Sequence, residues 1–407
     1  MVATRTGTEL IANRPKLPGL DVLRGFAALG VAWFHSRVDL WVGFKAIHAD
    51  PASYSTFDWA LSYFSLPVSQ MGGVVVLFFV LSGFCIHLPI ASKNRSPNWR
   101  AYAVRRFLRI YPAYLIVLLL CLLAAFVWFG ASGDQSGELN VYAASAVMAQ
   151  NWLFGGRQIA INPSLWTIPV EVEAYIFYPM LLWIWRRQGL VAACALTLAM
   201  TVIGVIFFAF GHDQATSTFF KYGVIWSSGA WLAEVYSRGR LPGWTKWHFM
   251  GIIGTAVVTM MLGLAGVNVF YLHYGWALCS FLLLLWVLGP GASFFSGNQW
   301  WVPPLMFTGT VSYSLYLLHF PLFKLAGAAW IQLYGSKPES FLVPTLATVL
   351  VVPMAWVFYR LIELPSHNVA RKLGGFYPAR HCIANLKSMS DQPLPAPEPR
   401  DENPFNS

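Results

Sequence analysis

The stretch QMGGVVVLFFVLSGFCIHLPIA, residues 70–91, contains no Asp, Glu, Lys or Arg over its whole length. A helix rises about 1.5 Å per residue, so about 20 mostly apolar residues are enough to cross the hydrocarbon core of a bilayer. Residues 70–91 meet that requirement. We therefore predict that they form a membrane-spanning helix.

Nine further segments have a similar length and apolar character, near 18–38, 112–130, 167–185, 189–210, 219–236, 248–267, 270–289, 304–333 and 341–363. The composition of the 407-residue chain agrees, because 57% of its residues are hydrophobic, 16% are aromatic and only 11% are charged. A soluble domain carries about 25% charged residues. We predict an all-α polytopic membrane protein with about ten transmembrane helices in a lipid bilayer.

The basic residues between the apolar segments predict the orientation of the protein. With the N-terminus inside the cell, most Lys and Arg residues fall in cytoplasmic loops, including the run 93–109 and the pair Arg186 and Arg187. An even number of helices returns the C-terminus to the same side. We therefore expect cytoplasmic N- and C-termini, and outward loops at 39–69 and 131–166 that could cover a site.

The chain divides into three expected parts. Residues 1–17 form a cytoplasmic N-terminal segment, and residues 18–365 form the transmembrane domain. Residues 366–407 are polar and then rich in proline. This tail has too few apolar residues to bury a core, so we expect it to be cytoplasmic and largely disordered.

Charge and cysteine content argue against two kinds of partner. The formal net charge is +10, but the basic residues cluster between apolar segments, so we expect no nucleic-acid partner. The five cysteines show no CxxC or other metal-ligand spacing, and we expect no metal site.

Two ionisable residues share the first apolar segment. Arg24 and His35 are eleven residues apart, which in a helix corresponds to about 16 Å along the axis and about 20° around it. They therefore lie on one stripe, near opposite ends of the helix. A neutral imidazole accepts a proton from a hydroxyl near neutral pH, so His35 is a candidate general base. The alternative is that Arg24 anchors the helix and His35 is an interfacial histidine.

A basic motif, Arg105-Arg106-Phe107-Leu108-Arg109, comes just before the third apolar segment. Arg106 and Arg109 fall on one helical face. Paired guanidinium groups bind phosphate oxygens well, so this face is a candidate anion site on the cytoplasmic side. The alternative is a simple topology signal.

An acidic motif opens the fourth apolar segment, in the sequence SLWTIPVEVEAY of residues 164–175. A carboxylate beside an imidazole fixes its tautomer and stabilises the imidazolium, which is a possible role for Glu171. The alternative is an acidic first turn favoured by the helix dipole.

Together these motifs resemble those of the acyltransferase-3 family, integral-membrane enzymes that O-acylate sugars and related acceptors. The resemblance covers about residues 18–365 and includes six motifs in family order: Arg24-x10-His35, VLFFVLSGF (76–84), RRFLRIYP (105–112), SLWTIPVE (164–171) with Tyr175 and Pro179, SYSLYLLHFP (312–321) and YRLIELP (359–365). Many members carry a second acid directly after the one that matches Glu171. Here Val172 takes that position and Glu173 follows, so we transfer a role to Glu171 only.

The resemblance implies an acyl-CoA donor, usually acetyl-CoA, that enters from the cytoplasm, without a metal. Arg106 and Arg109, with Arg105 beside them, would hold the CoA phosphates. His35 would be the general base and Glu171 would orient it, while Arg24 would neutralise phosphate or position another group. A bacterial-type cytoplasmic (inner) membrane is the expected location.

The acceptor is expected to be an extracytoplasmic or lipid-linked glycan, whose sugars could stack on Trp152 and Trp166, unless these rings are interfacial anchors. Ser82, Tyr175 and Tyr316 are candidate donors to an oxyanion. His319 either lines the cavity or makes a hydrogen bond between helices.

Several alternatives stay open. The acyl group could pass through an acyl-histidine intermediate rather than directly, and the acceptor could be a glycosylated small molecule such as a macrolide. A secondary transporter or sugar exporter would show related halves, which the sequence lacks. We expect Glu363 to pair with Arg360 or to cap the last helix. The remaining ionisable residues within apolar segments are expected to be structural or cavity-lining, namely Lys221, Glu234, His273 and Lys324.

Overall fold

The computed structural model describes residues 17–92, 97–128, 135–212, 217–243, 245–295 and 299–373, and within these ranges the chain is helical without a strand. The long helices are α1 (Pro18–Leu40), α5 (Val75–Ala91), α6 (Trp99–Trp128), α8 (Thr167–Gln188), α9 (Leu190–Ala209), α10 (Phe219–Ser237), α11 (Lys246–Leu264), α12 (Val269–Leu288), α14 (Ser312–Tyr334) and α15 (Leu342–Phe358). The shorter ones are α2 (Phe44–Ala49), α3 (Thr56–Ser62), α4 (Ser65–Val68), α7 (Gln135–Ala146), α13 (Val302–Thr310) and α16 (Leu364–Leu373). The all-α prediction is confirmed.

In the described part of the chain, eight helical stretches are long and apolar enough to cross a membrane. Each of the ten predicted segments contains a helix, but α1 and α10 are not among those eight. Both carry buried or half-buried ionisable residues, such as Arg24 in α1 and Lys221 in α10. The protein is thus a multi-pass membrane protein, and α1 and α10 carry ionisable residues within the bundle.

Three predicted segments have different bounds in the structure. The last one, 341–363, continues as helix to Leu373 and so includes the first residues of the predicted tail. The third helix begins at Trp99 rather than near residue 112, because the arginines that lower the hydropathy of its first turns are good helix formers. The segment 304–333 is broken at Val311, where α13 ends and α14 begins. Residues 1–16 and 374–407, which include most of the predicted terminal parts, lie outside the described residues.

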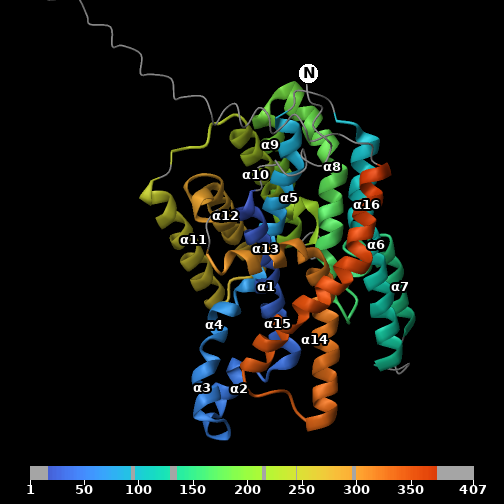
Figure 1. Ribbon diagram of the computed structural model, residues 1–407, viewed down its shortest axis with the longest axis vertical. Coiled ribbons are helices and arrows are strands. Elements are labelled where there is room, and N and C mark those ends of the chain that lie inside the picture. The colour runs from blue at the N-terminus through green and yellow to red at the C-terminus, as the bar shows by residue number, and fades with distance from the viewer. Residues whose placement is uncertain are drawn as a thin grey trace, which may run out of the picture. The chain divides into compact units, whose positions relative to one another are not determined.

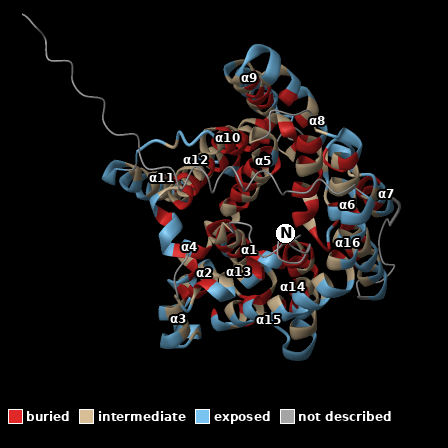
Figure 2. Ribbon diagram, turned by 45° about the horizontal axis from the view of Figure 1, so that its top comes forward, coloured by how far each residue is buried: buried red, intermediate tan, exposed pale blue. Residues whose placement is uncertain are grey.

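The helices turn their buried faces toward one another and their exposed faces outward (Figure 2). The outward faces are apolar, as expected for contact with lipid, and α11 buries only Thr259. At one end of the molecule α2 and α3 lie near the loop that joins α14 to α15 (Figure 1). The indole of Trp41 donates a hydrogen bond of 2.9 Å to the Glu339 carbonyl and ties these parts together.

Two glycines allow the helices that carry the site to cross closely. A Cβ atom at Gly83 of α5 would lie 1.9 Å from the Trp226 carbonyl oxygen of α10. A Cβ at Gly25 of α1 would lie 2.0 Å from the Leu305 carbonyl oxygen of α13. Small residues permit such backbone contact between membrane helices. The glycines thereby fix their neighbours in sequence, Ser82 and Arg24, beside a central cavity.

Candidate active site

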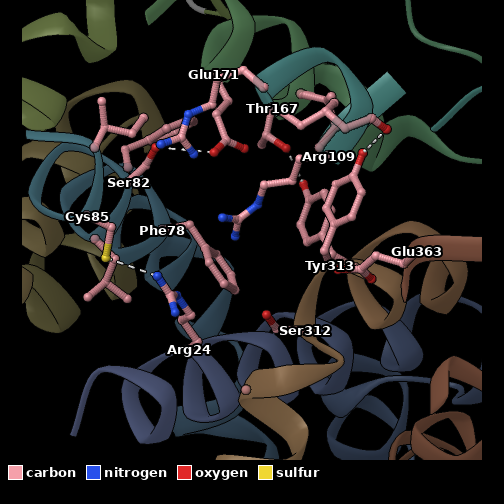
Figure 3. A pocket seen from close by; sticks show the side chains of 18 of the residues that line it. Arg24, Phe78, Ser82, Cys85, Arg109, Thr167, Glu171, Ser312, Tyr313 and Glu363 are labelled. Atoms are coloured by element: carbon pink, nitrogen blue, oxygen red, sulfur yellow. Dashed lines mark hydrogen bonds between the residues drawn. The ribbon is translucent and has the colours of Figure 1, made fainter. Parts of the chain in front are cut away.

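A cavity of about 310 Å³ is lined by residues of α1, α5, α6, α8, α13, α14 and α16 (Figure 3). We call it the arginine cavity, because Arg24, Arg106 and Arg109 all line it. Its volume is at the lower end of the range for small-molecule sites. Three guanidinium groups in one pocket make it a strong candidate for binding an anion.

Arg24 is held in the arginine cavity by its neighbours on two helices. One guanidinium nitrogen donates a 3.0 Å hydrogen bond to Asp21, one turn earlier in α1. Another lies 3.0 Å from the Cys85 sulfur of α5 (Figure 3). Asp21 balances part of the charge, and the group is fixed in place without being withdrawn from the cavity.

Arg106 and Arg109 reach the cavity from the early turns of α6. The Arg106 guanidinium lies over the rings of Tyr102 and Tyr175, 5.7 and 5.2 Å from their centroids. Arg109 points into the cavity (Figure 3), and within the described ranges no group accepts a hydrogen bond from it. Arg105 does not line this cavity. The structure thus separates the three arginines of the motif into two that face the cavity and one that does not.

Glu171 also lines the arginine cavity, where two hydroxyl groups hold it. Ser82 donates a 3.2 Å hydrogen bond to Glu171 Oε1, and the Tyr175 hydroxyl donates to the same oxygen. No contact between Glu171 and His35 occurs among the described residues. In this geometry Glu171 is hydrogen-bonded to Ser82 and Tyr175 rather than to His35, so its role in orienting His35 stays a prediction.

Glu363 enters the arginine cavity because the end of the α15 helix changes to π-helical geometry over Tyr359–Glu363. Such π-turns are frequent at functional sites. The carboxylate accepts a 2.6 Å hydrogen bond from Ser314 of α14. The predicted partner Arg360 instead lies over the Trp356 ring.

His35 pairs with a second histidine. Its Nδ1 lies 2.9 Å from Nε2 of His319, a buried residue of α14. His319 Nδ1 lies 2.7 Å from the carbonyl oxygen of Tyr316. A carbonyl only accepts, so His319 Nδ1 carries the proton and, in the neutral ring, Nε2 accepts from His35. The Nε2 atom of His35 is then left with its lone pair, as a general base requires.

His35 lines a second cavity, of about 460 Å³, together with Trp166, Lys221, Tyr222 and His273. We call it the histidine cavity. It shares the lining residues Val75 and Tyr316 with the arginine cavity, so the two cavities adjoin. Arg24 and His35 lie on one stripe of α1 as predicted, and each faces its own cavity.

The shared wall is rigid. The Tyr316 hydroxyl donates a 2.7 Å hydrogen bond to the Ser164 carbonyl and accepts one of 2.8 Å from Thr167. Its single proton is therefore already used. Tyr316 is better placed to separate the cavities than to donate to an oxyanion.

The two tryptophans predicted to contact the acceptor differ. Trp166 lines the histidine cavity, and its ring plane is inclined by 26° to that of His273, with centroids 6.4 Å apart. Trp152 does not line it, and its indole donates a 2.6 Å hydrogen bond to Glu173. Glu173 also accepts a 2.6 Å bond from the backbone nitrogen of Phe219. Trp152 and Glu173 thus cap the start of α10.

The profile of a family described as an acyltransferase domain matches residues 17–360. The chain belongs to the acyltransferase-3 family. This confirms the family predicted from the sequence. No solved structure matches the chain.

Curated relatives share between a fifth and a third of their aligned residues with this acyltransferase-3 chain. "O-acetyltransferase OatA" of Staphylococcus aureus is 23% identical over 398 residues, covering 89% of this chain and 59% of the relative. "Putative peptidoglycan O-acetyltransferase YrhL" of Bacillus subtilis is 26% identical, covering 86% and 54%. The chain thus spans little more than half the length of these two. "Nodulation protein 10" of Rhizobium leguminosarum bv. viciae is 27% identical, covering 87% and 94%.

The sequence analysis gave no catalytic or binding role to four residues that line the cavities of this acyltransferase-3 chain, namely Lys221, His273, Glu363 and Cys85. Lys221 and His273 stood out only as ionisable residues in predicted membrane helices, whereas Glu363 also lies in the family motif YRLIELP. Cys85 gave no signal, because a lone cysteine in an apolar segment resembles any core residue.

Proposed function

We propose that this protein transfers an acyl group, most simply acetyl, from cytoplasmic acyl-CoA to a hydroxyl of an extracytoplasmic or lipid-linked glycan. The observation that carries the proposal is the pair of adjoining cavities along α1, one lined by Arg24, Arg106 and Arg109 and the other by His35. A two-substrate transfer across a membrane needs such an arrangement, with a donor site and a base that is reached from the other side.

The arginine cavity suits the phosphate groups of CoA. Arg109 has an uncommitted guanidinium within the described structure, and the Arg106 guanidinium lines the cavity while it lies over the rings of Tyr102 and Tyr175. Phosphate oxygens accept paired hydrogen bonds from such groups. A cytoplasmic donor would place this end of α1 on the inner side, in agreement with the charge distribution of the sequence.

The histidine cavity suits a hydroxyl acceptor. The acceptor O–H would give its proton to His35 Nε2 while the oxygen forms a bond to the thioester carbon. The carbonyl π electrons move to oxygen, and their return breaks the C–S bond. The CoA thiolate then takes the proton from the His35 imidazolium, so the histidine is regenerated. Ring faces such as that of Trp166 offer a stacking surface for a sugar.

The test uses the full chain in proteoliposomes with ¹⁴C-acetyl-CoA trapped inside and acceptors outside. Peptidoglycan fragments are one acceptor, suggested by the name of the Bacillus relative, and chitotetraose is a neutral second. Label in the oligosaccharide is expected with wild type, and His35→Ala is expected to lower transfer by about 10²–10⁴-fold. Transport of an acceptor without labelling, unchanged in His35→Ala, would favour an exporter and contradict the proposal.

A further inference from the structure

Lys221 is a buried amine in the wall of the histidine cavity. It is 2% exposed and lies in the first turn of α10, where it lines the same cavity as His35. Among the described residues no carboxylate forms an ion pair with it. Glu173, which caps α10 at Phe219, does not pair with it either.

This position is costly for the fold. A charge inside a membrane helix is unfavourable unless it has a partner or a wet cavity. The N-terminal end of a helix also repels cations through the helix dipole. A methionine would fill the same space without either penalty. These costs suggest a role other than stability, and the polar groups beside the lysine belong to the histidine cavity.

His273 and Tyr222 hold the lysine in place. Lys221 Nζ and the Tyr222 hydroxyl each lie 2.9 Å from Nδ1 of His273. The Nζ atom also lies 4.4 Å from the centroid of the Phe270 ring. One N–H of the lysine suffices for His273, and at least one more N–H stays available in both the charged and the neutral form.

The three oxyanion donors predicted from the sequence have already used their protons. Ser82 and Tyr175 donate to Glu171 in the arginine cavity. Tyr316 donates to the Ser164 carbonyl. The acyl transfer proposed above nevertheless develops negative charge on the carbonyl oxygen, and such charge needs a donor fixed in advance.

We infer that Lys221, positioned by His273, donates a hydrogen bond to the oxyanion formed when the acceptor attacks the acyl donor in the histidine cavity. The inference rests on the proposed function and adds the electrostatic partner of His35. As the acceptor proton moves to His35 and the new C–O bond forms, the π electrons collect on the oxygen facing Lys221. They return to carbon as the C–S bond breaks, and Lys221 keeps its protons throughout.

The test compares wild type, Lys221→Met, Lys221→Gln and Lys246→Met in the proteoliposome assay. Lys246 is the matched control, because it is exposed at the start of α11 and lines neither cavity. Lys221→Met is expected to lower kcat by about 10²–10³-fold with an unchanged acceptor KM. Its melting temperature should not fall. Lys221→Gln keeps an N–H donor and should lose less, and it decides the question if the methionine variant does not fold.

Three other outcomes would contradict the inference, and they can be told apart from one another. If wild type transfers label, His35→Ala does not, and Lys221→Met keeps its kcat, the proposed function stands and this inference fails. If only the KM for the anionic peptidoglycan fragments rises, with normal kcat and normal transfer to chitotetraose, Lys221 binds an acidic group of the acceptor instead. If wild type labels neither acceptor, the proposed function fails and the inference fails with it.

Discussion

His35 Nδ1 and His319 Nε2 lie 2.9 Å apart, although the two residues are separated by 284 positions in the chain. The backbone carbonyl of Tyr316 fixes the tautomer of His319, and His319 in turn fixes that of His35. In many hydrolases a carboxylate does this work. Here a neutral ring orients the base, and in the described structure no carboxylate is hydrogen-bonded to either histidine of the pair. Electrostatic stabilisation of the imidazolium must therefore come from elsewhere in the cavity.

Replacing His319 should therefore impair chemistry without impairing donor binding. His319→Phe removes the acceptor for His35 Nδ1 and frees that ring to adopt either tautomer, so we expect kcat to fall by about 10²-fold. His319→Gln offers a side-chain carbonyl as a substitute acceptor and should lose less. Steady-state kinetics with acetyl-CoA would check this. Equal losses of kcat in both variants would contradict the orienting role of the hydrogen bond between His35 and His319.

The arginine motif allows a matched comparison of donor binding. Arg109 faces the arginine cavity, whereas Arg105, four residues earlier, does not line it. A hydrogen bond to a charged group contributes about 1.5–3 kcal/mol, so Arg109→Gln should weaken the Kd for CoA by about 10- to 100-fold. Arg105→Gln should leave the Kd within about twofold of wild type. Equilibrium binding of tritiated CoA measures the Kd of both variants. Equal effects would indicate that the basic motif only sets the membrane topology.

The helices and the residues that share a helical face were predictable, because both depend on local sequence patterns. The length and apolarity of each segment predict the helices, and the eleven-residue spacing of Arg24 and His35 predicts their common stripe on α1. Arg106 and Arg109 share a face in α6 for the same reason, their three-residue spacing. The family motifs added the likeness that the profile match confirms.

The partners of these residues were not predictable, because they depend on how distant helices cross. His319 meets His35 only because α14 packs on α1, and Glu171 reaches Ser82 only because α8 and α5 both line the arginine cavity. The sequence analysis chose the acid Glu171 as the partner of the base His35, whereas in the structure His319 is hydrogen-bonded to His35. Glu363 depends on a π-turn, which single-sequence hydropathy does not reveal.

The crossing of α5 and α10 should be sensitive to one methyl group. Gly83→Ala would place a carbon against the Trp226 carbonyl and force the helices apart, at a cost of about 1–3 kcal/mol. Gly254 in α11 is the control, since a Cβ there meets nothing within 4 Å. Gly254→Ala should be neutral or stabilising by up to about 1 kcal/mol through helix propensity. Thermal unfolding in detergent compares them, and a Gly83→Ala protein as stable as wild type would show that the helices do not cross this closely.

The wall between the two cavities should control passage of the acyl group. Val75 lines both cavities and is 5% exposed. Val75→Phe adds bulk at the point where they adjoin, so we expect CoA to bind with unchanged Kd while transfer to the acceptor falls at least about tenfold. Val75→Ala removes bulk at the same place and should keep transfer, with a modest loss of stability of about 1–3 kcal/mol from the space left behind. Binding and transfer are measured on the same preparations, so a folding defect, which lowers both, is distinguished from a blocked passage. Normal transfer by Val75→Phe would mean that the donor reaches His35 by another route, and that the arginine cavity is not where the thioester arm begins.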